Sequence, residues 1–181
     1  MNKDLTKYIS NILKKNITLD KSCIIVKTTS QELEKLLSFF KDHENCMFKT
    51  LIDIFVIDYP ESKDRFLVSY LLLSLKYNIR ARIEVSVDEL TSIPSVSSIY
   101  KSACWMEREI WDMNGIFFDH HPDLRRILTD YSFEGYPLKK DFPLSGYTEV
   151  RYDDSQKRVV SELVEMSQDY RVFNFKSSWE V

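Results

Sequence analysis

The feature that most constrains the fold of this chain is a strict alternation of apolar and polar side chains near its middle. The alternating residues are Ile79, Arg80, Ala81, Arg82, Ile83, Glu84, Val85 and Ser86. Because successive side chains of a strand point to opposite faces, residues 78–87 are predicted to form a strand of an antiparallel sheet with one wet face. We expect the apolar side chains to be buried and the two arginines to be more exposed.

Two apolar runs directly precede this strand and predict its neighbours in the sheet. Residues 51–59 are predicted to form a buried strand that Pro60 closes, and residues 65–75 the next strand after a polar turn. Three successive strands with short connections favour a meander, in which each strand runs antiparallel to the one before it.

The N-terminal part of the chain combines one strand with two stretches of helical periodicity. Apolar residues at helical spacing predict a short amphipathic helix over residues 4–15, and a β-branched run predicts a strand over 22–28. A helix is predicted over 29–43, since Thr29 and Glu32 have the capping-box spacing that marks a helix start.

A further helical pattern spans residues 95–114. Its apolar side chains repeat at intervals of three and four residues, and Asn114-Gly115 then ends it. Strands and helices in this order predict an α+β domain over residues 1–114, with a small, mostly antiparallel sheet and flanking helices.

The composition changes after this helix. All three glycines lie between residues 115 and 146, and ten of the 24 aromatic residues lie between Trp105 and Tyr152. Glycine punctuates irregular backbone, whereas a disordered linker would be poor in aromatic residues. We therefore expect residues 115–181 to form an extended, irregular segment that wraps a partner subunit.

Charge, hydropathy and cysteine spacing exclude several classes of protein. A formal net charge of −3 argues against a nucleic-acid binder, and no apolar run approaches the roughly 20 residues of a membrane span. The three cysteines, Cys23, Cys46 and Cys104, match no zinc or iron–sulfur spacing and are too few for a four-thiolate cluster. The first residues lack the apolar core of a secretory signal, so either no presequence exists or one has been removed.

Two constellations could carry chemistry. Glu107, Glu109 and Asp112 could act as acid and base, but an ion pair between Arg108 and Asp112, four residues apart on the helix, explains them better. His120 and His121 beside Asp123 could bind a metal, which leaves a stand-alone metal-binding enzyme as an alternative function. A polar turn shaped by Pro122 is the structural explanation of the same residues.

Basic side chains are frequent in the C-terminal third, where acidic ones interleave with them. This mixture predicts ion pairs within the chain or across an interface. A free adaptor domain for an acidic partner is a second alternative, although the chain has no basic excess.

A long motif resembles one known family. It reads EREIWDMNGIFF at 107–118, HPDLRRILTDY at 121–131 and FEGYPLKKDFP at 133–143. This closely resembles the signature of the 30-kDa family of respiratory complex I, whose members are called subunit 9 in mitochondrial genomes. The chain departs from the family at Ser132, where glycine is usual, at Tyr136, where histidine is common, and at Lys139, where arginine is usual.

The resemblance implies a function without catalytic residues in this chain. It implies a structural, cofactor-free subunit in the peripheral arm of proton-pumping NADH:quinone oxidoreductase, supporting the subunits that form the quinone site. Flavin and iron–sulfur clusters would then belong to partner subunits, and NADH:ubiquinone reductase activity to the whole complex. The implied partners are the hydrogenase-large-subunit-like (49-kDa) chain and the small-subunit-like chain, with no nucleic acid and no membrane span.

The resemblance also implies a location and a set of interface residues. Richness in Ile, Lys, Asn, Phe and Tyr suggests an AT-rich genome and favours the matrix side of the mitochondrial inner membrane over a bacterial cytoplasm. Buried aromatic and basic side chains dominate the energetics of interfaces. The interface candidates are Arg125, Arg126, Phe133, Tyr136, Lys139, Lys140, Phe142, Tyr147, Arg151 and Trp179.

Overall fold

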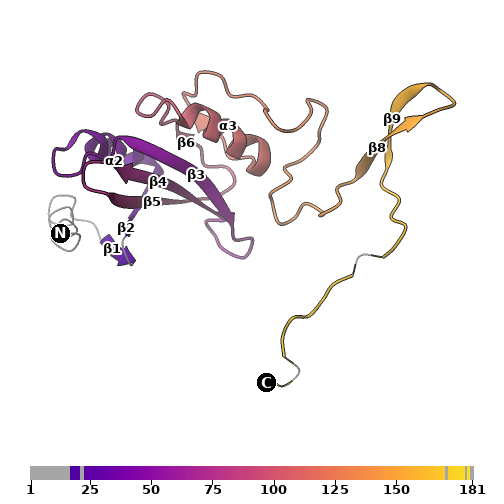
Figure 1. The fold of residues 1–181 in the computed structure, drawn as a ribbon, viewed down its shortest axis with the longest axis horizontal. Helices are drawn as coiled ribbons and strands as arrows, with labels where there is room; N and C mark the ends of the chain where they lie inside the picture. The colour runs from indigo at the N-terminus through magenta and orange to yellow at the C-terminus, as the bar shows by residue number, and fades with distance from the viewer. Residues whose placement is uncertain (1–16, 21–22, 170, 178, 180–181) are drawn as a thin grey trace. The chain divides into compact units, whose positions relative to one another are not determined.

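The computed structural model describes residues 17–20, 23–169, 171–177 and 179 of the 181-residue chain (Figure 1). The amphipathic helix predicted over residues 4–15 lies outside the described residues. The chain divides into two compact units, Met1–Phe142 and Pro143–Val181. Within the described ranges, no helix is both long and apolar enough to cross a bilayer.

The first unit is built on one five-stranded sheet with the strand order β1-β2-β5-β4-β3. All neighbouring strands are antiparallel except β2 and β5, which are parallel. The strands are β1 (Ile17–Asp20), β2 (Cys23–Thr28), β3 (Thr50–Asp58), β4 (Phe66–Ser74) and β5 (Ile79–Val87). The predicted α+β class, mostly antiparallel sheet and meander of β3, β4 and β5 are therefore confirmed.

The predicted register of β5 is also confirmed. Ile79, Ala81, Ile83 and Val85 are buried, whereas Arg80 is exposed and Arg82 is half-buried. Their neighbours in the sheet follow the same period, since Ala81 lies between Ile24 of β2 and Leu72 of β4, and all three are completely buried. Glu84 departs from the predicted alternation, since it is buried and pairs with Arg82 at 2.8 Å.

Helix α2 (Ser30–Asp42) begins where the sequence predicts, but without a side-chain cap. Thr29 is the N-cap residue in extended backbone, and its side chain makes no capping hydrogen bond. Packing stabilises the helix instead, because Leu33, Leu37 and Phe40 are completely buried against the sheet.

The helix predicted over residues 95–114 is shorter than expected and spans Ala103–Asn114 as α3. Residues 95 and 96 bind to the helix instead of joining it, because the Glu107 carboxylate accepts hydrogen bonds from the Ser95 hydroxyl and the Val96 amide. Turns then connect Val96 to the helix start. Gly115 ends α3 as predicted, with φ +80° and its amide donating to the Trp111 carbonyl.

Both helices cover the same face of the sheet. Leu37 and Phe40 of α2 and Ala103 and Ile110 of α3 belong to one hydrophobic core with the inward side chains of the strands. Two short parallel strands, β6 (Ile93–Pro94) and β7 (Phe118–Asp119), flank α3 in sequence.

The predicted boundary after residue 114 differs from the division in the structure, which falls after Phe142. Residues 115–142 have little regular structure, as predicted, but they belong to the first unit. The Leu138 amide donates to the Met113 carbonyl, and the Lys140 amide donates to the Asp58 carboxylate. These bonds satisfy irregular backbone within the chain itself.

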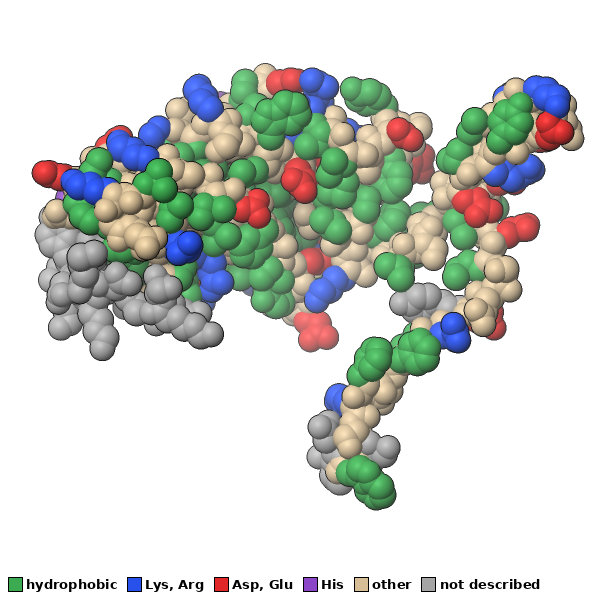
Figure 2. All heavy atoms as spheres, viewed as in Figure 1, with side chains coloured by type: hydrophobic (Ala, Val, Ile, Leu, Met, Phe, Trp, Pro, Cys, Tyr) green, Lys and Arg blue, Asp and Glu red, His purple; other side chains and the backbone are tan. Residues whose placement is uncertain are grey.

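The second unit contains an antiparallel hairpin that the sequence patterns did not predict. Its strands are β8 (Thr148–Asp153) and β9 (Arg158–Leu163), and Lys157 precedes β9 with φ +54°. None of its described residues is buried. Apolar side chains, green in Figure 2, lie along this unit instead of forming a core.

Candidate subunit interface

The Asp112 carboxylate organises the irregular segment that follows α3. It accepts backbone hydrogen bonds from Ile127 at 3.2 Å, Leu128 at 2.8 Å and Thr129 at 2.9 Å, and lies 3.2 Å from Arg126 Nη1. Burial would raise the pKa of Asp112, but hydrogen bonds from Thr129, Leu128 and Ile127 hold it below its ordinary value. A helix side chain thus fixes a turn that has no secondary structure of its own.

The predicted ion pair between Arg108 and Asp112 is replaced by two other contacts. Asp112 pairs with Arg126. Arg108 instead donates to the backbone carbonyls of Arg125 at 3.1 Å and Arg126 at 3.3 Å, with its guanidinium 5.2 Å from the Trp105 ring centroid. The prediction was wrong because the following segment returns over α3 and competes for both side chains.

Tyr136 lies at the centre of a cluster of predicted interface residues. Its ring centroid is 5.9 Å from the Arg126 guanidinium and 5.1 Å from Lys139 Nζ. The ring also covers Gly115, where an added Cβ would stand 2.7 Å from a Tyr136 carbon. The residue that ends α3 must therefore be glycine both for its positive φ and for this close approach.

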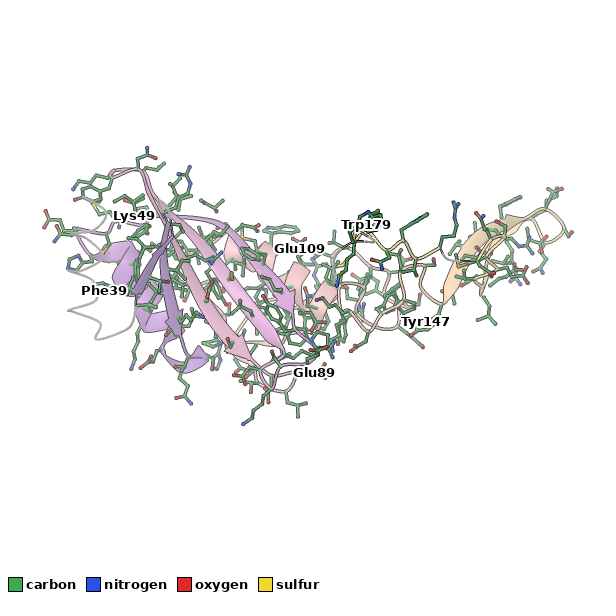
Figure 3. All side chains as sticks on the ribbon, turned by 90° about the horizontal axis from the view of Figure 1, so that it is seen from below. Phe39, Lys49, Glu89, Glu109, Tyr147 and Trp179 are labelled. Carbon is green, nitrogen blue, oxygen red and sulfur yellow. The ribbon has the colours of Figure 1, made fainter. Side chains whose placement is uncertain are left out.

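An ion-pair network joins the end of the segment to the sheet. The Asp58 carboxylate accepts hydrogen bonds from Arg65 Nε at 2.7 Å, from Arg65 Nη2 at 2.9 Å and from the Lys140 amide at 2.9 Å. Arg65 also pairs with Asp141 and with Glu89, which is labelled in Figure 3. The Arg65 hydrogen bond is the main reason that the pKa of Asp58 lies below its ordinary value.

Phe133 and Phe142 contact each other, with ring centroids 5.7 Å apart, and both are half-buried. Gly135 lies under this pair with φ +101°, and a Cβ there would come within 3.0 Å of the Phe142 ring. This ring contact joins two parts of the irregular segment.

The remaining candidates are exposed. Arg125 pairs with Asp123 at 2.9 Å. On the second unit, Arg151 pairs with Glu162 across the hairpin at 2.6 Å. Tyr147 and Trp179, labelled in Figure 3, are 62% and 91% exposed.

Sequence reasoning missed several exposed apolar side chains on the first unit. They are Trp105, Phe117, Leu128, Tyr131 and Leu138, each more than half exposed. The one available signal was the position of Trp105 off the apolar stripe of α3. Their side chains are available for contact with another protein.

His120 and His121 do not share a site. His120 is exposed with φ +60°, whereas the side chain of His121 is completely buried, 3.1 Å from the Cys104 carbonyl and 3.7 Å from Glu107. In the part of the chain that the structure describes, no three His, Cys, Asp or Glu side chains are grouped to hold a metal ion. Ser132, which replaces the usual glycine of the family, does not have a positive φ.

Comparison with known proteins identifies the family. Residues 26–148 match the model of the respiratory-chain NADH dehydrogenase 30 Kd subunit. The chain is 57% identical over 155 residues to NADH-ubiquinone oxidoreductase subunit 9 of Reclinomonas americana, covering 86% of this chain and 75% of that protein. It is 50% identical to an NADH-quinone oxidoreductase subunit of Paramagnetospirillum magneticum, covering 98% of this chain and 92% of that protein.

A plant relative gives the same result under a different name. NADH dehydrogenase (ubiquinone) iron-sulfur protein 3 of Beta trigyna is 60% identical over 153 residues, covering 84% of this chain and 80% of that protein. The family match contains the whole Asp112 and Tyr136 arrangement, so the geometry described above belongs to the region that defines the family. The chain therefore belongs to the 30-kDa subunit family of respiratory-chain NADH dehydrogenase, which is complex I.

Proposed function

We propose that this chain is a structural, cofactor-free subunit of the peripheral arm of complex I. In this role it supports the subunits that form the quinone site and carry electrons from NADH to quinone. No residue of this chain acts in catalysis, and activity arises only in the assembled complex. Family membership supports the subunit role, and the exposed apolar surface supports a structural one.

The observation that carries the proposal is the absence of a core in the second unit. Across its described residues no side chain is buried, although Tyr147, Val150, Tyr152 and Leu163 are apolar or aromatic. A two-stranded hairpin alone is at best marginally stable in water. Such a segment gains its stability by burying these side chains on another protein.

The hairpin has two chemically different faces, which indicates how it binds. The pairing of β8 with β9 places Val150, Tyr152, Val159 and Leu163 on one face, all more than half exposed. The opposite face carries the Arg151–Glu162 ion pair, which is satisfied within the hairpin. The apolar face therefore lies against the partner, and the charged face lies toward water.

The partners that fit this role are the 49-kDa, hydrogenase-large-subunit-like chain and the small-subunit-like chain of the arm. The complex then places this protein at the mitochondrial inner membrane, on the matrix side. The ubiquinone-linked names of the Reclinomonas americana and Beta trigyna relatives support membership of the respiratory complex on which this location depends.

The proposal that this chain holds no cofactor rests on the metal-binding side chains that it contains. An iron–sulfur cluster needs four ligands, commonly thiolates, and the chain has three cysteines. Burial raises the pKa of the Cys46 thiol to about 11. We assign the flavin and the iron–sulfur clusters of the complex to partner subunits.

A pair of neighbouring substitutions tests the proposed orientation of the hairpin. Val159→Asp places a charge on the apolar face, and Val160→Asp places it on the charged face opposite Arg151. Burying an unpaired charge costs several kcal/mol, so Val159→Asp should lower recovery of the tagged chain with complex I by about tenfold or more. Val160→Asp serves as the control and should keep most of the recovery. Equal recovery of both variants would reject a docked apolar face.

A further inference from the structure

His121 occupies a buried position beside a buried carboxylate. The side chains of His121 and Glu107 are both completely excluded from solvent, with His121 Nε2 3.7 Å from Glu107 Oε2. Nε2 also lies 3.1 Å from the carbonyl oxygen of Cys104. On the other side of the ring, Nδ1 lies 3.1 Å from the backbone nitrogen of Asp123.

These two contacts determine where the ring carries its proton. The Asp123 amide can only donate, so Nδ1 must accept and has no proton. The Cys104 carbonyl can only accept, so Nε2 must carry the proton. The observed geometry therefore requires the neutral Nε2–H tautomer of His121, and the Asp123 hydrogen bond exists in that state alone.

Glu107 is a buried carboxylate with one basic neighbour among the described residues. Its carboxylate accepts hydrogen bonds from the Ser95 hydroxyl at 2.6 Å and the Val96 amide at 2.8 Å, and burial raises its pKa. Within the described part of the chain, His121 is the only basic side chain within 4 Å of it. The buried hydroxyl of Tyr70 on β4 also feels the charge of Glu107 and has no hydrogen-bond partner.

The other charged and titratable groups around His121 lie at the edge of this site. Asp123 is exposed, and its hydrogen bond with Arg125 holds its pKa below the ordinary value. Cys104 of α3 contributes its carbonyl to His121. None of these groups replaces Glu107, which is the buried group of opposite charge to a protonated ring.

We propose that His121 and Glu107 form a buried proton-binding pair that sets the position of residues 120–126. When a proton from solvent binds Nδ1, two donors face each other and the Asp123 amide loses its acceptor. The charged ring is attracted to Glu107, and the chain around Asp123 is released. The released segment carries Arg125 and Arg126, whose carbonyls accept hydrogen bonds from Arg108. Protonation of His121 therefore changes the position of these two proposed interface residues.

The chain contains a natural control for this behaviour. His43 forms the same local bond, with its Nδ1 3.2 Å from the backbone nitrogen of Asn45, and its ring packs against Phe39 with the ring centroids 4.7 Å apart. The two histidines thus share the local bond, and the buried Glu107 carboxylate lies beside the ring of His121. A comparison of the two separates the effect of Glu107 from that of the turn itself.

The test is a nuclear magnetic resonance titration of the full chain. Above neutral pH, the ring ¹⁵N shifts of His121 should show the Nε2–H tautomer. On acidification, the ring and the Asp123 amide should change together with one midpoint. Because Glu107→Gln removes the buried carboxylate beside the ring, it should change that midpoint, whereas a neighbour that does not interact with the ring would leave it unchanged.

Two substitutions complete the test. His121→Gln should abolish the acid response of the Asp123 amide, whereas His43→Gln should leave it unchanged. The proposal is overturned by an Nδ1–H tautomer in the wild type, by an Asp123 amide that does not respond, or by a response that persists in His121→Gln. An unchanged midpoint in Glu107→Gln overturns the pairing. The tautomer is read from the wild type, so the test survives a variant that fails to fold.

Discussion

At the scale of single residues, two carboxylates bind irregular backbone of the first unit. Asp112 accepts three successive amides of the segment 127–129, and Asp58 accepts the amide of Lys140. The sequence shows where these acids stand but not which donors return to them, because the path of an irregular segment leaves no local pattern. The sequence-based prediction therefore paired Asp112 with the wrong arginine.

Asp112→Asn should destabilise the first unit by about 2–4 kcal/mol, because charge-assisted hydrogen bonds to a buried carboxylate are lost. Glu109→Gln on the exposed face of α3 is the matched control and should change stability by less than about 0.5 kcal/mol. Chemical denaturation of both variants measures the difference. Equal stabilities would show that the amides of 127–129 do not depend on Asp112.

The pH dependence of stability follows from the same residue. The folded pKa of Asp112 lies below its unfolded value, so the unfolded chain binds the proton more tightly. The contribution is present above the ordinary aspartate pKa of about 3.9 and is lost as the pH falls through the lower folded value. Wild type should therefore lose stability faster than Asp112→Asn below about pH 4. Parallel curves would contradict this assignment.

At the scale of elements, regular sequence patterns predicted the secondary structure well, whereas irregular segments were predicted poorly. The alternation of β5 and the apolar stripe of α2 predicted type, extent and burial, because each pattern has one period and one buried face. The start of α3 was misplaced because turns at 96–102 also place apolar residues three and four apart. The hairpin was missed because nearby Gly and Pro indicate irregular backbone and its apolar face is not buried within the chain.

Gly115→Ala tests the close contact between the end of α3 and the Tyr136 ring. The substitution forces a side chain into positive φ and against the Tyr136 ring, so we expect a loss of about 1–3 kcal/mol. Combining it with Tyr136→Ala relieves the contact but not the backbone strain. The double variant should therefore lose less stability than the sum of the single variants, as denaturation measures. Strict additivity would exclude the close approach.

At the scale of the whole molecule, the chain has one core and one segment without a core. Every buried hydrophobic residue among those described lies between Ile24 and Phe118. Composition predicted an irregular C-terminal third that binds a partner, but it could not show that residues 115–142 belong to the first unit. That arrangement depends on hydrogen bonds between distant residues, which leave no periodic signal.

The number of cysteines predicts the metal content of the isolated chain. With three cysteines in separate elements, the purified full chain should contain no stoichiometric iron or zinc and show no flavin absorbance. Elemental analysis and an absorbance spectrum measure this directly. One equivalent of iron or a flavin band would contradict the cofactor-free role.

The central claim is that the first unit folds alone and the second joins it to the complex. The most direct test is deletion of residues 143–181, with thermal unfolding of the remaining chain measured beside its recovery in complex I on a native gel. We predict an unchanged cooperative transition, because the core lies in the retained unit, and loss of the chain from the band with NADH dehydrogenase activity. Recovery of the truncated chain in that band at the wild-type level, or loss of its cooperative unfolding, would contradict the account.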